Sequence, residues 1–342
     1  MTQAEIANPS PPRGRDWRPV LARYSTLAAL IALIVFNLIV TKHFISWRTL
    51  DVNLTQVAAI VIVGVGMTLV IATGGIDLSV GSLMAIAGAL APIIFLGKIV
   101  RIPEIHVAVA VAMIVSVLVA GAFGWFNGWL ITRFRIQPII ATLVLFIAGR
   151  GIAQVSTNGN LQPFKLDTFQ WIGLGRLFAP ENPTAAGFKG IPDQVFIMVV
   201  LVAAAAWALN RSLFGRQILA IGGNERAARL AGVPVASVKR WVYCISGLCA
   251  GLAGLVHIAI NSSSDANLVG MGMELDAIAA VAVGGTLLSG GRATVTGTLI
   301  GALIIQLVRY TLLTNGVPDD AAKLVKAALI VAAVWLQRRG RG

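Results

Sequence analysis

Residues 66–89 read GMTLVIATGGIDLSVGSLMAIAGA, in which a glycine pair and a short polar segment separate two apolar runs. The first run covers 57–73 and the second 78–96, so each has close to the ~20 residues that a membrane helix needs. A helix that breaks within a membrane must have its backbone groups satisfied by neighbouring protein or by a water-lined cavity. The stretch therefore predicts two membrane helices joined by a break.

The composition of the whole chain agrees with a membrane protein. Of its 342 residues, 57% are apolar and 12% are charged, whereas a soluble domain carries about 25% charged residues. This excludes most soluble enzymes. Eight further apolar runs lie at 24–40, 105–131, 138–155, 193–209, 241–260, 274–288, 293–313 and 321–336. We therefore predict an all-α polytopic membrane protein of about ten transmembrane helices, several of them broken or tilted.

The positions of the basic residues indicate the orientation of the chain. Lys and Arg number 27 against 14 Asp and Glu. With the N-terminus inside, sixteen of the 27 fall in inside segments and seven in outside loops, the bias typical of cytoplasmic loops. We expect cytoplasmic tails at 1–23 and 337–342, a single membrane domain at 24–336, and no removable signal peptide. The Lys and Arg residues are too dispersed to neutralise the phosphates along a nucleic-acid backbone, so we expect no nucleic-acid partner.

Two connections between the runs are long. Residues 156–192 are polar and rich in Gly, Pro and Asn, and we expect them to form a periplasmic loop. Residues 210–240 lie on the cytoplasmic side and contain helix formers from Asn224 to Ala231. Asn224 is the expected N-cap, Glu225 lies in the first turn and Gly232 ends the segment. This predicts a surface helix too short to be stable alone.

The glycine-rich break occurs twice in the chain. GGIDLSVG (74–81) and GGTLLSGG (284–291) match at five of eight positions and lie 210 residues apart. Internal repeats with broken helices in corresponding places are typical of membrane transporters. The alternative is chance convergence of glycine-rich joints in a chain with 36 glycines.

The second copy contains LSGGR (288–292), which is similar to the signature of ATP-binding-cassette (ABC) ATPases. An ATPase also needs a phosphate-binding loop that ends in Gly-Lys followed by Ser or Thr. The single Gly-Lys pair here, Gly97-Lys98, is followed by Ile99. We expect no ATP hydrolysis by this chain.

Few polar residues lie within the apolar runs, and such residues usually face a cavity or a partner. Asp77 has two compatible interpretations, as a cap of the helix that follows or as part of a cavity lining. Arg150 is expected near the outer interface, with its side chain extended to water. Glu274 and Asp276 open a helix, where negative charge is favourable. Neither His nor Cys residues have metal-ligand spacing, and we predict no catalytic site, no metal site and no cofactor.

The chain resembles the permease subunits of bacterial ABC importers for monosaccharides, the ribose, xylose and galactofuranose type. The matching stretches are 66–89, IQPIIATLVLFIAGRGIAQ (136–154), GNERAARLAGV (223–233), SGLCAGLAG (246–254) and ELDAIAAVAVGGTLLSGGRATVTGTLIGALI (274–304). They run through nearly the whole chain. Through 141–154 and 265–281 it looks most like galactofuranose permeases.

The resemblance implies a multi-pass permease in the bacterial inner membrane that imports a monosaccharide by alternating access, surrounded by membrane lipid. Its implied partners are a second permease subunit, the same or a paralogue, a periplasmic sugar-binding protein, and a separate ATPase that uses ATP and Mg²⁺. The family's coupling helix corresponds to the short helix, and the residues assigned to ATPase coupling are Gly215, Gly222, Asn224, Glu225, Ala228 and Gly232. The residues expected along the substrate pathway are Gly74, Gly75, Asp77, Ser79, Gly284, Gly285 and Ser289.

Other functions stay open at this point. The solute could instead be ribose, fructose, autoinducer-2 or a branched-chain amino acid, although a branched-chain amino-acid permease would lack GGIDLSVG. An ion-coupled secondary transporter needs a relay of intramembrane carboxylates, for which Asp77 is the single convincing candidate. A membrane enzyme is disfavoured by the lack of a nucleophile-base or metal constellation.

Overall fold

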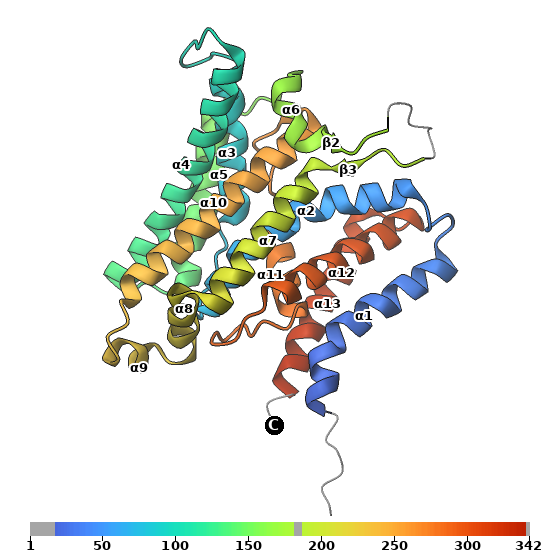
Figure 1. Ribbon diagram of the computed structural model, residues 1–342. Helices are drawn as coiled ribbons and strands as arrows, with labels where there is room; N and C mark the ends of the chain where they lie inside the picture. The colour runs from blue at the N-terminus through green and yellow to red at the C-terminus, as the bar shows by residue number, and fades with distance from the viewer. Residues whose placement is uncertain (1–17, 181–186, 340–342) are drawn as a thin grey trace, which may run out of the picture.

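The computed structural model describes residues 18–180 and 187–339, most of which belong to helices (Figure 1). Ten of these helices coincide with the ten predicted apolar runs. They are α1 (Arg18–Val40), α2 (Trp47–Ala72), α3 (Val80–Phe95), α4 (Ile105–Phe134), α5 (Pro138–Ser156), α7 (Asp193–Arg211), α10 (Val235–Asn261), α11 (Met273–Val283), α12 (Val295–Thr314) and α13 (Asp319–Arg339). Residues 1–17 and 340–342 of the predicted tails lie outside the described residues.

Not all of these helices have the length of a full membrane crossing. Among the described residues, α2, α4, α5, α7, α10 and α12 are long and apolar enough to cross a membrane. In contrast, α3 has 16 residues and α11 has 11. The predicted all-α polytopic fold is confirmed, while the count of ten crossings stays a prediction.

The centre of the structure is formed by α2 and α10. In the most apolar part of α2, 83% of the residues are buried, and the figure for α10 is 67%. The corresponding figures for α5 and α7 are 28% and 22%. The outer helices therefore present apolar surface away from the protein, as expected for helices in contact with lipid.

Glycines bring α4 and α10 into close contact. A Cβ atom at Gly124 would lie 2.3 Å from the carbonyl oxygen of Tyr243, and one at Gly247 would lie 2.4 Å from that of Ala120. No larger residue fits at such distances without moving a backbone. Because lipid is as apolar as the side chains, close van der Waals packing of this kind is a main source of helix association in membranes.

The loop at 156–192 closes one end of the bundle, called here the α6 end. It contains α6 (Asp167–Leu174) and three short strands, β1 (Gln162–Pro163), β2 (Arg176–Leu177) and β3 (Ile191–Pro192). β2 pairs with β3, and β1 pairs with β4 (Ser263–Ser264), which follows α10. Arg176 forms an ion pair with Asp51 of α2, and this pair raises the pKa of the Arg176 guanidinium. The loop is therefore fixed to the helix bundle rather than detached from it.

The opposite end, called here the α9 end, carries α8 (Leu213–Gly223) and α9 (Glu225–Leu230). Figure 1 shows the beginning of α1 and the end of α13 at this same end. The two described chain ends therefore lie on one side of the bundle, together with the short helices.

At both glycine motifs the chain reverses direction near the α9 end. The ring of Phe95, in the last turn of α3, lies 5.1 Å from that of Phe169 in α6, and the first turns of α2 also lie at the α6 end. In the second copy α11 and α12 pack side by side, since Gly284 lies against Gly297 and Ala280 against Gly301. Each motif thus joins a helix that ends at this level to one that starts there.

Candidate functional site

The first glycine motif forms a joint between α2 and α3, residues 73–79. The backbone N–H groups of Gly74 and Gly75 donate to the carbonyl oxygens of Ile71 and Val70, closing the end of α2. Gly74 has a φ angle of +80°, a conformation that residues with a Cβ atom adopt only at a cost. The motif therefore specifies a helix end, as its sequence predicted.

Asp77 lies in this joint with its carboxylate fully buried. One carboxylate oxygen accepts hydrogen bonds from the N–H and the hydroxyl of Ser79, at 3.0 and 2.6 Å. The other accepts from the hydroxyl of Ser246 in α10, at 2.8 Å. Asp77 therefore binds the backbone just before α3, although the residue at the N-cap position of α3 is Ser79. The carboxylate also connects the joint to α10.

A cluster of polar side chains surrounds Asp77 and Ser79. Asn127 of α4 donates from Nδ2 to the hydroxyl oxygen of Ser79 at 3.0 Å, and Tyr243 of α10 lies so close that a Cβ atom at Gly75 would be 2.4 Å from its hydroxyl oxygen. Within the described structure, the Asn127 Oδ1 atom and the Tyr243 hydroxyl are buried without a hydrogen-bond partner. A buried polar group left unpaired costs about 1–3 kcal/mol. A ligand that forms hydrogen bonds with these two groups would remove that cost.

The second glycine motif forms a joint between α11 and α12, residues 284–294. Gly285, Gly290 and Gly291 all have positive φ angles, between +79° and +85°. The Thr294 N–H donates to the Thr286 hydroxyl oxygen at 3.1 Å, and the Thr294 hydroxyl donates to the Gly284 carbonyl oxygen at 3.2 Å. These bonds satisfy backbone groups that the reversal leaves outside a helix.

The two joints meet each other and the C-terminal end of α8. The Gly291 N–H donates to the carbonyl oxygen of Ala72 at 3.1 Å. A Cβ atom at Gly222 would lie 1.8 Å from that same oxygen and 2.4 Å from the Gly291 nitrogen, while one at Gly290 would lie 2.8 Å from the Gly74 nitrogen. We call this contact of Ala72, Gly74, Gly222, Gly290 and Gly291 the glycine junction. It joins the two predicted pathway motifs to a residue of the predicted coupling segment.

The predicted short helix is present as α9. The side chain of Asn224 caps it by accepting the Ala227 N–H at 3.0 Å. Gly232 has a φ angle of +80° just after its end. Ala228 is buried against the protein, whereas Leu230 is 85% exposed. The helix thus offers an apolar side chain to the surroundings at the α9 end.

Further contacts hold the segment around α9 in place. A Cβ atom at Gly215 would lie 2.2 Å from the carbonyl oxygen of Leu209, so the turn from α7 into α8 also requires glycine. Glu225 accepts hydrogen bonds from Lys239 of α10 and from Arg229. Partial burial alone would raise the pKa of the Glu225 carboxyl, but these two cations hold it below its ordinary value.

Two charged residues within the apolar runs, Arg150 and Asp276, have clear partners, whereas the Oε2 atom of Glu274 is buried without a hydrogen-bond partner in the described structure. We expected the side chain of Arg150 to extend to water, but its guanidinium instead donates to the carbonyl oxygens of Ala266 and Val269 at 2.9 and 2.6 Å. The reason is that the loop after α10 places backbone acceptors within its reach. Asp276 lies in the first turn of α11, as predicted, and pairs with Lys326 of α13.

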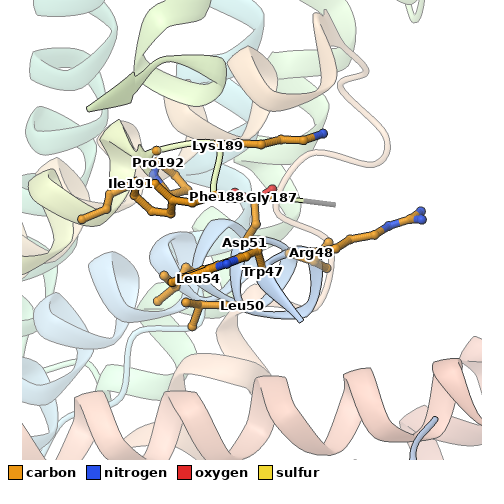
Figure 2. Close-up of a pocket in the computed structure, with 12 residues that line it drawn as sticks. Trp47, Arg48, Leu50, Asp51, Leu54, Gly187, Phe188, Lys189, Ile191 and Pro192 are labelled. Carbon is orange, nitrogen blue, oxygen red and sulfur yellow. The ribbon is translucent and has the colours of Figure 1, made fainter. Parts of the chain in front are cut away.

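A surface pocket of about 320 Å³ lies at the α6 end, between the start of α2 and residues 187–192 (Figure 2). The rings of Trp47 and Phe188 form part of its wall, 5.1 Å apart, and Figure 2 shows Arg48 and Lys189 extending away from the protein. None of the predicted site residues lines it. This pocket is therefore separate from the joints and from α9.

Sequence reasoning missed Asn127, Tyr243 and Ser246, which complete the polar cluster. Each is a polar residue within an apolar run, a signal close to the one that singled out Asp77 between two such runs. Their meeting at one place depends on the packing of α4 and α10 against the first joint. It could not be read from spacing along the chain.

Comparison with known proteins adds three relatives and a family. Residues 49–334 match the family described as the permease component of a branched-chain amino acid transport system. The ribose import permease protein of Escherichia coli is 40% identical, over 93% of this chain and 94% of that protein. The galactofuranose transporter permease protein of the same organism is 36% identical, over 91% and 88%. A fructose import permease protein of Bifidobacterium longum is 33% identical, over 91% and 86%. No solved structure matches.

Proposed function

The chain belongs to this family of importer permeases, and we propose that it carries a neutral monosaccharide from the periplasm into the cytoplasm by alternating access. It is a multi-pass protein of the inner membrane and the permease subunit of a sugar ABC importer. Such a permease is not itself an enzyme, and ATP is hydrolysed by a separate subunit.

The glycine junction is the observation that carries the mechanism. Gly222 is the second-last residue of α8, shortly before α9, and it lies against the backbones of Ala72 at the end of α2 and of Gly291 in the second joint. Backbones in direct contact move together, because there is no side chain between them that can change rotamer to absorb a displacement. A movement of α9 imposed by an ATPase would therefore reach the end of α2 and the second joint at the same time.

The polar cluster is the part of the structure best suited to a sugar. Hydroxyl-rich neutral ligands need hydrogen-bond donors and acceptors without a large net charge. The cluster offers one carboxylate, the hydroxyls of Ser79, Ser246 and Tyr243, and the Asn127 amide. We propose that displacement of the first joint opens this cluster to the pathway, with Gly74, Gly75, Gly284, Gly285 and Ser289 forming the movable backbone.

The orientation we propose places the α9 end in the cytoplasm and the α6 end in the periplasm. It follows from the basic residues, which are concentrated in the segments at the α9 end, the bias of cytoplasmic segments. The ATPase then docks on α9, where Leu230 projects, and a sugar-binding protein docks at the α6 end. The exposed apolar faces of the outer helices are left for lipid and for a second permease subunit.

The sugar itself is the finer part of the proposal. Ribose is the first candidate and galactofuranose the second, in the order of identity of the relatives that carry them. Both are small neutral sugars that differ in size by one carbon with its hydroxyl. A branched-chain amino acid would bring two charged groups at the α-carbon into a cluster that holds a single carboxylate and, apart from it, uncharged groups.

A substrate panel tests this proposal. The permease is reconstituted in proteoliposomes with its ATPase and binding protein, and uptake of radiolabelled ribose, galactofuranose, fructose and leucine is measured. We expect uptake of one of the sugars to exceed that of leucine by more than tenfold. Leucine uptake equal to that of the best sugar would contradict the assignment.

A further inference from the structure

A groove of about 760 Å³ lies at the α9 end, between α9, the start of α10 and the turn from α4 into α5. It is distinct from the glycine junction, and none of the residues of the two joints lines it. Five cationic side chains line this groove together with one carboxylate, and they are Arg133, Arg135, Arg226, Arg229, Lys239 and Glu225. We call it the cationic groove.

The charges of the cationic groove do not balance. Glu225 accepts from Arg229 at 3.0 Å and from Lys239 at 2.6 Å, so one carboxylate serves two cations. None of the ion pairs in the described part of the chain includes Arg133, Arg135 or Arg226. Four positive charges are left in excess, and the planar guanidinium group is well suited to bind phosphate with two parallel hydrogen bonds.

The backbone conformation of Arg135 indicates that its side chain has a function. This residue ends α4 with a φ angle of +58°, in the left-handed region. Glycine or asparagine adopts that conformation more easily than arginine. A strained backbone that presents a charged side chain is a pointer to function rather than to stability.

Aromatic side chains place the cationic groove at the level of lipid head groups. Trp129 near the end of α4 lies 5.2 Å from Phe134, ring to ring, and the Arg240 guanidinium lies 5.8 Å from the centre of the Trp125 ring. Trp241 of α10 is half exposed. Tryptophan is enriched at membrane–water interfaces, where its ring lies at head-group depth. Beside the groove, Ile139 and Ile140 on the first turn of α5 are exposed and can contact acyl chains.

We propose that the cationic groove binds the phosphate head group of an anionic phospholipid, with preference for a lipid that carries two phosphates. Arg133 and Arg135 would hold one phosphate at the α4–α5 turn, and Arg226 and Arg229 the other on α9. The lipid would thereby connect α9 to the turn between α4 and α5. That the lipid comes from the cytoplasmic leaflet rests on the orientation proposed above, but binding in the groove does not.

The alternative occupant is an acidic surface of the ATPase, and two observations favour lipid. The groove lies within about one helical turn of Trp129 on α4 and of Trp241 on α10, the aromatic side chains of the interfacial type. In addition, the most exposed apolar side chain of α9, Leu230, lies outside the groove and stays available for a protein partner. Basic pockets between membrane helices on the cytoplasmic side are known to bind such head groups.

Binding is measured by native mass spectrometry of the full-length chain, titrated with cardiolipin, phosphatidylglycerol, phosphatidylcholine or inorganic phosphate. The groove variant is R133Q/R135N/R226Q, in which asparagine tolerates the left-handed conformation of residue 135. The control R211Q/R216Q/R292Q removes three exposed cations outside the groove at the same end, so both variants lose equal charge. If the triple groove variant has a lower melting temperature than wild type in phosphatidylcholine, the single variant R226Q replaces it, because Arg226 is exposed on α9.

We expect cardiolipin to bind most tightly and the groove variant to lose at least about tenfold in cardiolipin affinity, while the control stays within a factor of two of wild type. An equal loss in both triple variants would overturn the proposal, since it would show a general charge effect. Inorganic phosphate bound as tightly as cardiolipin would show a site for free anions instead. A groove variant that keeps its cardiolipin affinity but fails to bind the ATPase would assign the groove to the protein partner.

Discussion

Gly222→Ala tests whether α8 transmits motion to the joints. The new Cβ atom would lie 1.8 Å from the Ala72 carbonyl oxygen, whereas ordinary contacts of this kind begin at 3.4 Å. The two backbones must therefore separate by about 1.6 Å. Small-to-large changes in a packed site cost about 1–3 kcal/mol, and we expect a value near 3 because no flexible side chain can give way.

The adjacent glycine provides the matched control. A Cβ atom at Gly223 has no atom within 4 Å, so Gly223→Ala does not disturb the glycine junction. Both substitutions add the same helix stabilisation of about 0.5–1 kcal/mol. The difference between them therefore isolates the contact with Ala72 and Gly291.

The assay is ATP-driven sugar uptake by the reconstituted importer, divided by the amount of folded complex. We expect Gly222→Ala to lower uptake per folded complex by more than tenfold, and Gly223→Ala to change it by less than twofold. In the first variant ATP hydrolysis should also lose its stimulation by sugar. Equal uptake by the two variants would refute the idea that the glycine junction carries the motion.

The other predictions concern the polar cluster, the first joint, α9 and the orientation. Asp77→Asn should cost about 1 kcal/mol and Asp77→Leu at least twice that, because leucine leaves the buried N–H and hydroxyl donors unpaired; equal melting temperatures of the two variants would contradict the hydrogen-bonding role. Gly75→Val should reduce uptake more than folded abundance, since its side chain meets Tyr243 at the joint, and a parallel loss of both would indicate a packing role alone. Ala228→Asp places a charge at a buried position of α9 and should abolish sugar-stimulated ATP hydrolysis while the permease stays in the membrane; retained stimulation would argue against coupling through α9. A cysteine at Thr168 should react with an impermeant reagent added outside cells and one at Ser237 should not, and the reverse pattern would invert the proposed orientation.

The helices were predictable because apolar runs in a membrane protein have few alternatives to helix. Their ends were less predictable. The run at 57–73 extends back to Trp47 in α2, since the polar side chain of Asp51 is satisfied by Arg176 from a distant loop. Likewise α10 begins at Val235 rather than at 241, with Lys239 paired to Glu225. Hydropathy alone does not contain these partners.

The candidate site was predictable in its parts and not in its assembly. The glycine motifs and the cap at Asn224 are local patterns, and each has the local structure expected of it. In contrast, α8 was not predicted: within 210–240 helix formers were identified only from Asn224 to Ala231, and the structure adds a helix over LFGRQILAIGG. Gly222 contacts Ala72 across about 150 residues of chain. The need for glycine at that position is a property of the three-dimensional packing.

The central claim is that this chain is the permease of an ATP-driven sugar importer, and the energy source for transport tests it most directly. Proteoliposomes that contain the permease, its ATPase and its binding protein are loaded with ATP or with a non-hydrolysable analogue, and accumulation of labelled ribose or galactofuranose is followed without any ion gradient. We predict accumulation above the external sugar concentration with ATP and none with the analogue. Accumulation driven by a sodium or proton gradient in the absence of ATP would contradict the account and identify a secondary transporter.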